Sequence, residues 1–122
     1  MLLNTISELD SGKTILVLAQ GFNQTYTLPP AKLGLRYRFL VGSPLVGNNV
    51  TIASAVVGVI YGTLLNLTPG AAAAAAITAT QKNGTNNLVV TGTARLGDYV
   101  DMNCDGIYWY VSGLSTVAVG LT

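Results

Sequence analysis

Apolar and polar residues alternate with a period of two along much of this chain, a pattern typical of β-strands that bury one face. Residues 35–41 show it most clearly, because their apolar side chains fall on one face of a strand while Arg36 and Arg38 fall on the other. Turn signals such as Asn83-Gly84 and Asp105-Gly106 separate the runs at intervals typical of a sandwich or barrel. The alternation therefore predicts an all-β protein.

We expect one antiparallel β-sandwich of jelly-roll type over residues 1–122, with residues 1–10 available as an N-terminal contact arm. The predicted strands are 14–19, 24–28, 35–41, 48–54, 57–65, 87–91, 98–103, 107–112 and 116–120. The predicted core is Ile15, Val17, Tyr37, Phe39, Val50, Ile52, Val100, Trp109 and Val111.

The six-alanine run Ala71–Ala76 competes with an all-β reading, because alanine is the best helix former. Six residues are too few for a helix that is stable alone, and Ile77–Thr80 continues in the style of a strand. We therefore favour a close-packed strand or loop here, with a single helical turn as the alternative.

The composition of the chain argues against a β-fold that stands alone in water, because few charged residues are available to cover its surface. Half of the residues are hydrophobic and only 9% are charged, whereas a soluble domain carries about 25% charged residues. The longest apolar run, residues 55–65, is about half the length that a membrane-spanning helix needs, so we expect no membrane partner. The excess of apolar surface predicts burial against other protein subunits.

The charged residues and the single cysteine narrow the function further. The net charge of +1 and the scattered basic residues predict no nucleic-acid partner. The N-terminus has no basic region of the kind that begins a secretory signal. Cys104 is the only cysteine, so an internal disulfide is excluded.

Residues 101–106, Asp-Met-Asn-Cys-Asp-Gly, match the first half of a calcium-binding loop, in which oxygens at alternate positions converge on the ion. The match then fails, because the twelfth position is Ser112 instead of Glu. A β-hairpin between residues 98–103 and 107–112, turning at Asp105-Gly106, explains the same spacing. We therefore predict the hairpin and no metal.

Tyr108 and Tyr110 flank Trp109, which the strand pattern assigns to the core. The two tyrosines then share the outer face, where they can form either a ligand platform for a sugar or a subunit contact. We favour the subunit contact.

Catalytic chemistry has little support in this sequence. The chain contains no histidine, and no nucleophile, phosphate-binding or paired-cysteine motif occurs. A hydrolase built from Asp98 and Asp101 is the alternative that the carboxylates allow. We expect no enzymatic activity and no cofactor.

A series of short phrases spans residues 11–113 in a characteristic order: Ser11–Thr14, Tyr26–Pro30, Gly34–Val41, Leu96–Val100, Asp105-Gly106 and Trp109–Gly113. This order resembles that of small β-sandwich modules in structural proteins of tailed phages and large DNA viruses. Such modules occur in capsid decoration (cement) proteins, minor capsid proteins and fibre domains. The resemblance implies a virion component, often trimeric, without enzymatic activity.

We therefore expect a capsid decoration or minor capsid subunit that is made in the host cytoplasm and lies at the virion surface. Its expected partners are the major capsid protein and other copies of itself in a homotrimer. The expected subunit contacts are Leu2, Leu3, Ile6, Leu16, Leu18, Tyr108 and Tyr110, with further contacts in residues 55–76. A receptor- or glycan-binding fibre module is the alternative, and a secreted cellular lectin is a third.

Overall fold

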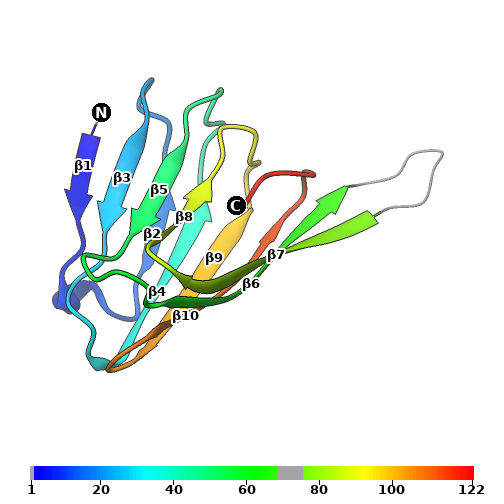
Figure 1. Cartoon of the computed structure of the whole chain (residues 1–122). Helices are drawn as coiled ribbons and strands as arrows, with labels where there is room; N and C mark the ends of the chain where they lie inside the picture. Colours follow the sequence, from blue (N-terminus) through cyan, green and yellow to red (C-terminus); the bar gives the residue numbers. More distant parts are fainter. Residues whose placement is uncertain (1, 69–75) are drawn as a thin grey trace.

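The computed structural model describes residues 2–68 and 76–122, and for Leu2 and Leu3 it describes the backbone alone. The described residues form β-strands and one 3-10 turn, arranged as two sheets that pack against each other (Figure 1). The elements are β1 (Leu2–Thr5), η1 (Glu8–Asp10), β2 (Thr14–Val17), β3 (Gln24–Thr27), β4 (Leu33–Val41), β5 (Val50–Ala53), β6 (Ile60–Thr68), β7 (Ala76–Thr85), β8 (Asn87–Val90), β9 (Tyr99–Asp105) and β10 (Trp109–Ser115). The prediction of an all-β fold is confirmed.

The strand order is β1-β3-β5-β8 in the four-stranded sheet and β2-β4-β9-β10-β6-β7 in the six-stranded sheet. In the first sheet β3 is parallel to both β1 and β5, and in the second β2 is parallel to β4 and β6 to β10. The other neighbouring strands are antiparallel. Both sheets are therefore mixed, so the expected antiparallel sheets are not what the strands form and the jelly-roll arrangement is not confirmed.

The parallel pairs follow from the path of the chain. From β1 to β6, successive strands alternate between the two sheets (Figure 1). A chain that crosses to the other sheet and returns has reversed direction twice, so the returning strand runs parallel to its predecessor. A turn signal in the sequence marks a reversal but does not say whether the next strand joins the same sheet.

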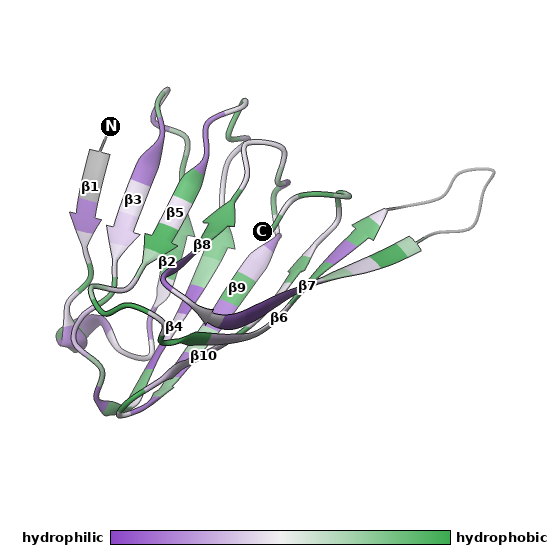
Figure 2. Cartoon of the chain, in the orientation of Figure 1, coloured by the Kyte–Doolittle hydropathy of each residue, from purple (hydrophilic) through white to green (hydrophobic). Residues whose placement is uncertain are grey.

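The core lies between the two sheets, where alternate residues of each strand point inward. All the predicted core residues are buried except Ile15, which is partly buried and packs against the others. Trp109 is 1% exposed and lies against Tyr37, with 5.9 Å between the ring centroids. Figure 2 shows hydrophobic residues along β5 and β8, which pack on this core.

The N-terminal residues belong to the four-stranded sheet, and their role as a contact arm stays a prediction. β1 pairs with β3 along its whole length, and the N–H of Ile6 donates a hydrogen bond to the carbonyl of Thr27. The Ile6 side chain is buried in the core of its own protomer. The sequence pattern missed β1 because four residues are too few to show a period.

The strand expected at residues 116–120 is a turn. Thr122 exchanges two backbone hydrogen bonds with Val89, and Leu121 forms a bridge with Val90. The end of the chain thus covers the outer edge of β8.

The β6–β7 hairpin extends beyond the rest of the molecule (Figure 1). The first four residues of β7, Ala76–Ala79, are exposed on both faces of the strand. Thr68 pairs with Ala76 and Leu67 with Ile77 at the far end. We call residues 67–68 and 76–79 the β6–β7 arm. Residues 71–75 of the alanine run lie outside the described residues, whereas the strand style of Ile77–Thr80 is confirmed.

Two buried polar side chains hold the last turns of the chain. The amide of Asn66 donates to the carbonyl of Leu121 and accepts from its N–H, both at 2.8 Å. The carboxylate of Asp98, which is 1% exposed, accepts hydrogen bonds from Arg95, Ser115 and Thr116. These hydrogen bonds hold residues 116–120 in place of the strand pairing that the sequence predicted for them.

Candidate functional site

The outer face of the six-stranded sheet carries a row of apolar side chains. The register aligns outward-pointing residues of β2, β4, β9, β10 and β6 in one line: Leu16, Leu40, Tyr99, Leu114 and Leu65. We call this line the outer apolar band. Leu16 is 53% exposed and Leu65 is 38% exposed. The three residues between them, Leu40, Tyr99 and Leu114, are partly buried. A partly exposed apolar row that crosses several strands is typical of a surface covered by another protein.

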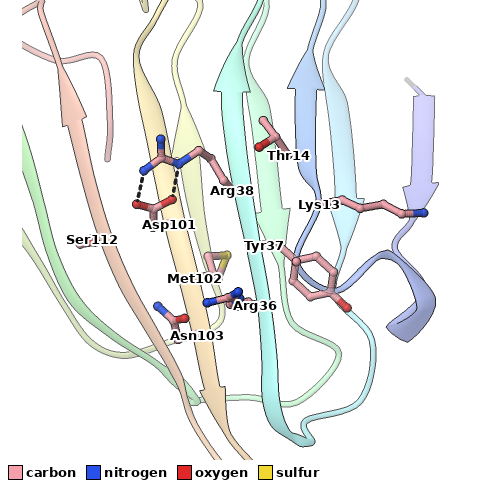
Figure 3. A pocket seen from close by; sticks show the side chains of 10 residues that line it. Lys13, Thr14, Arg36, Tyr37, Arg38, Asp101, Met102, Asn103 and Ser112 are labelled. Atoms are coloured by element: carbon pink, nitrogen blue, oxygen red, sulfur yellow. Dashed lines mark hydrogen bonds and ion pairs between the residues drawn. The ribbon is translucent and has the colours of Figure 1, made fainter.

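A polar trough of about 460 Å³ lies beside the outer apolar band, over β2, β4, β9 and β10 (Figure 3). Two consecutive cross-strand pairs form its floor, Arg38 with Asp101 and Arg36 with Asn103. Its remaining lining residues are Gly12, Lys13, Thr14, Tyr37, Met102 and Ser112. Three cations and one carboxylate thus line the trough, so a ligand there meets a positive surface.

The first pair in the trough is an ion pair. The Nε and Nη2 atoms of Arg38 donate to the two carboxylate oxygens of Asp101, at 2.7 and 2.9 Å. The hydrogen bond with Asp101 raises the pKa of the Arg38 guanidinium. The guanidinium also lies over the ring of Tyr99, 4.7 Å from its centroid, which is a cation–π contact. Asp101 therefore neutralises Arg38, and Tyr99 joins the trough to the outer apolar band.

The second pair has no acidic member. Arg36 lies beside Asn103 in Figure 3, and the neutral amide of Asn103 cannot balance its charge. Lys13 points away from the two arginines toward the N-terminal segment, where its Nζ lies 3.1 Å from Asp10. Arg36 is consequently the cation of the trough that has no carboxylate beside it.

Every carboxylate side chain of this protein falls within the described residues, and each one has a partner. Glu8 binds Lys32, Asp10 binds Lys13, Asp101 binds Arg38, and Asp98 and Asp105 accept hydrogen bonds from nearby N–H and O–H groups. The three remaining cations, Arg36, Lys82 and Arg95, form no ion pair among the described residues. Arg36 alone of these lines the trough.

The predicted β9–β10 hairpin is confirmed, and Asp105 organises its loop. One carboxylate oxygen accepts from the backbone N–H groups of Ile107 and Tyr108, and the other accepts from the hydroxyl of Tyr110. The bonds from Tyr108 and Ile107 hold the pKa of the Asp105 carboxyl below its usual value. The carboxylate oxygens of Asp101 and Asp105, which a calcium loop would direct at an ion, thus accept hydrogen bonds from Arg38 and from the hairpin itself.

Tyr108 and Tyr110 lie on the outer face as predicted, 38% and 46% exposed. They share it with Tyr61 of β6, which the sequence analysis did not single out. The rings of Tyr61 and Tyr108 meet edge to face at 5.2 Å, and Tyr110 donates its hydroxyl to Asp105. Contacts within the chain therefore hold all three rings.

The structure separates the predicted contact residues into three groups. Leu16, Leu18, Tyr108 and Tyr110 are exposed on the six-stranded sheet, where a subunit contact stays a prediction. Ile6 is 5% exposed and belongs to the core of its own protomer, so its side chain is not free for a neighbour. Leu2 and Leu3 lie in β1, and their side chains are outside the described residues.

Sequence reasoning missed Tyr61, the isolation of Arg36 and the projecting hairpin, although it expected contacts in residues 55–76, which include part of the β6–β7 arm. A signal for the outer face of β6 existed, since Tyr61, Thr63, Leu65 and Leu67 alternate with inward-facing positions. The isolation of Arg36 had no sequence signal, because it depends on which residue of β9 lies opposite.

No cluster of three or more His, Cys, Asp or Glu side chains suited to a metal occurs in the part of the chain that the structure describes. Within the same residues, no helix is long and apolar enough to cross a membrane. Comparison with protein-family models, with curated proteins and with solved structures finds no match to this chain.

Proposed function

We propose that this protein is a structural subunit of a virion, a capsid decoration (cement) or minor capsid protein that binds the major capsid protein and stabilises the shell. The observation that carries the proposal is the outer apolar band. Together with the low charge content, it gives the protein an apolar row on the outer face of the six-stranded sheet. Burying such surface contributes about 25 cal/mol per Å².

The dimensions of this face suit a stable contact. Strands spaced by about 4.8 Å and rising about 3.3 Å per residue give the six-stranded sheet a face on the order of 24 by 23 Å. The accessible area of this face is larger than its projected area, because side chains project from the sheet. A standard interface buries about 800 Å² on each partner, so the roughly 550 Å² of projected face would supply most of the area of a specific complex.

The β6–β7 arm supports a second contact, between copies of this chain. Ile77 is 68% exposed at the far end of a hairpin that extends beyond the two sheets. β7 is also an edge strand, so one side of its backbone is unpaired along the sheet. We assign the homotrimer contact to this arm and the shell contact to the outer apolar band.

A glycan-binding fibre module is the competing function. It would use the rings of Tyr108 and Tyr110, but contacts with Tyr61 and Asp105 already hold both side chains. A sugar would have to stack on the part of each ring that these contacts leave exposed, 38% for Tyr108 and 46% for Tyr110. The tyrosine cluster therefore favours a preorganised protein contact over an open stacking platform.

Co-sedimentation with shells assembled from the major capsid protein tests the proposed function. The Leu16→Glu/Leu65→Glu variant places two charges in the outer apolar band and is expected to lose most shell binding. Val119→Glu is the matched control, because Val119 is 59% exposed but lies outside the band. Wild-type binding by the double variant, with circular dichroism confirming that each protein is folded, would contradict the proposal.

A further inference from the structure

We propose that the polar trough binds a carboxylate side chain, Asp or Glu, presented by the protein that covers the outer apolar band. This inference rests on the proposed function and specifies the chemistry of the partner. It makes Arg36 the residue that recognises the partner's acidic group.

The first argument is the geometry of the trough. Arg36 extends from β4 beside Asn103 of β9, and the neighbouring Arg38 is already held by both oxygens of Asp101. A guanidinium presents paired N–H donors that match the two oxygens of a carboxylate. An incoming carboxylate at Arg36 would reproduce the adjacent Arg38–Asp101 pair one step along the same strands.

The second argument is the charge balance, which excludes a second copy of this chain as the source of the carboxylate. All five carboxylate side chains are already bound within the protomer. A second copy that offered Asp101 or Asp10 would have to break an existing ion pair to do so. A copy placed face to face would also bring two positively charged troughs together.

The third argument is the continuity of the trough with the outer apolar band. Arg38 lies over the ring of Tyr99, and Tyr99 belongs to the band. A partner that covers Leu16 and Leu40 therefore also reaches the trough. If that partner carried no acceptor there, it would remove water from the Arg36 guanidinium without replacing the lost hydrogen bonds. An unpaired buried charge is costly, so the covering surface must supply an anion there.

These arguments favour a protein carboxylate over an acidic saccharide. The two outer-face rings nearest the trough already have partners: Arg38 lies over the ring of Tyr99, and the hydroxyl of Tyr110 donates to Asp105. A saccharide that stacked beside Arg36 would have to share one of these rings, whereas a carboxylate needs only the guanidinium. The acidic saccharide is instead an outcome that the test can reveal.

The test is an NMR titration of the ¹⁵N-labelled full chain with a ten-residue oligoglutamate at low salt. We expect the backbone amides of Asn103 and Ser112 and the Arg36 Nε–H to shift with saturation, and the shifts to disappear in high salt. Arg36→Gln is expected to weaken binding about tenfold, a change that corresponds to about 1.4 kcal/mol, because the paired guanidinium donors are lost. Arg95→Gln, which removes an unpaired cation outside the trough, is the matched control and should bind as the wild type does.

Four results would overturn the proposal. They are equal weakening by both substitutions, no shift at Asn103 and Ser112, tighter binding of 3′-sialyllactose at the same residues, and shifts there that depend on protein concentration alone. The failure of the proposed function looks different, because shell co-sedimentation would then be absent while oligoglutamate still bound at Arg36. Conversely, shell binding that persists unchanged in Arg36→Gln would contradict this inference and leave the proposed function intact.

Discussion

The burial of an individual side chain could be predicted from the sequence where it depends only on the alternation within its own strand. Trp109 and Phe39 fall in the core as the alternation predicts, because a one-residue shift would place either ring in water. Asp98 and Arg36 were not predictable in the same way. The burial of Asp98 depends on Ser115 and Thr116, and the isolation of Arg36 depends on Asn103.

Asp98 offers the clearest test at this scale. Asp98→Ala leaves the hydroxyl of Ser115 and the N–H groups of Arg95 and Thr116 without an acceptor. We expect the free energy of unfolding to fall by about 2–3 kcal/mol, because the buried hydroxyl of Ser115 and two partly buried N–H groups lose their acceptor, and a buried unsatisfied donor costs roughly 1–3 kcal/mol. Urea denaturation of the wild-type and variant proteins measures the change, provided that the two unfolding free energies depend on urea concentration with the same slope.

Asp101→Ala is the matched control for Asp98→Ala. It removes a carboxylate whose partner is an exposed arginine, and such surface pairs contribute about 0–1 kcal/mol. Similar losses of stability in the two variants would contradict the role assigned to Asp98.

At the scale of single elements, the sequence predicts strands better than it predicts how they pair. The hairpin of β9 and β10 is the success, because Asp105-Gly106 marks a local turn between two alternating runs. The parallel pairs of β1, β3 and β5 are the failure. Their parallel orientation follows from the crossing of the chain between the two sheets. The residues of a single strand give no indication of that crossing.

The same hairpin should respond to pH through Asp105. Its carboxyl has a lower pKa in the folded chain than in the unfolded chain, because the N–H groups of Tyr108 and Ile107 bind the ionised form. The stabilisation is therefore present above the unfolded value of about 3.9, and it is lost as the pH falls through the lowered folded pKa. We expect the amide resonances of Ile107 and Tyr108 to move together with a midpoint below about pH 3.9.

The Asp105→Asn variant should abolish that titration while the hairpin register persists. A midpoint at or above about 3.9 in the wild-type chain would show that the loop hydrogen bonds do not favour the carboxylate.

At the scale of the whole molecule, composition was the most informative part of the sequence. A content of 9% charged residues predicted unpaired apolar surface, and the structure shows such surface on the outer apolar band and on the β6–β7 arm. The location was only partly predictable. Residues 55–76 were expected to carry contacts and include part of the arm, whereas Ile6, also expected at a contact, fills the core.

The β6–β7 arm makes a definite prediction about assembly. Leu67→Asp/Ile77→Asp changes two cross-strand neighbours that lie beyond the packed sheets, so the fold of each protomer should survive. We expect this variant to be monomeric, because two charges on the arm oppose its burial between copies. Val119→Asp, an exposed apolar position away from the arm, should leave the assembly unchanged.

Size-exclusion chromatography with light scattering on the full wild-type chain, at micromolar concentration, is the most direct test that this protein is a subunit built for assembly. The proposed function predicts the mass of a homotrimer of 12.6 kDa protomers, reduced to a single protomer by the Leu67→Asp/Ile77→Asp substitutions. A wild-type chain that stays monomeric across this concentration range would contradict the central claim.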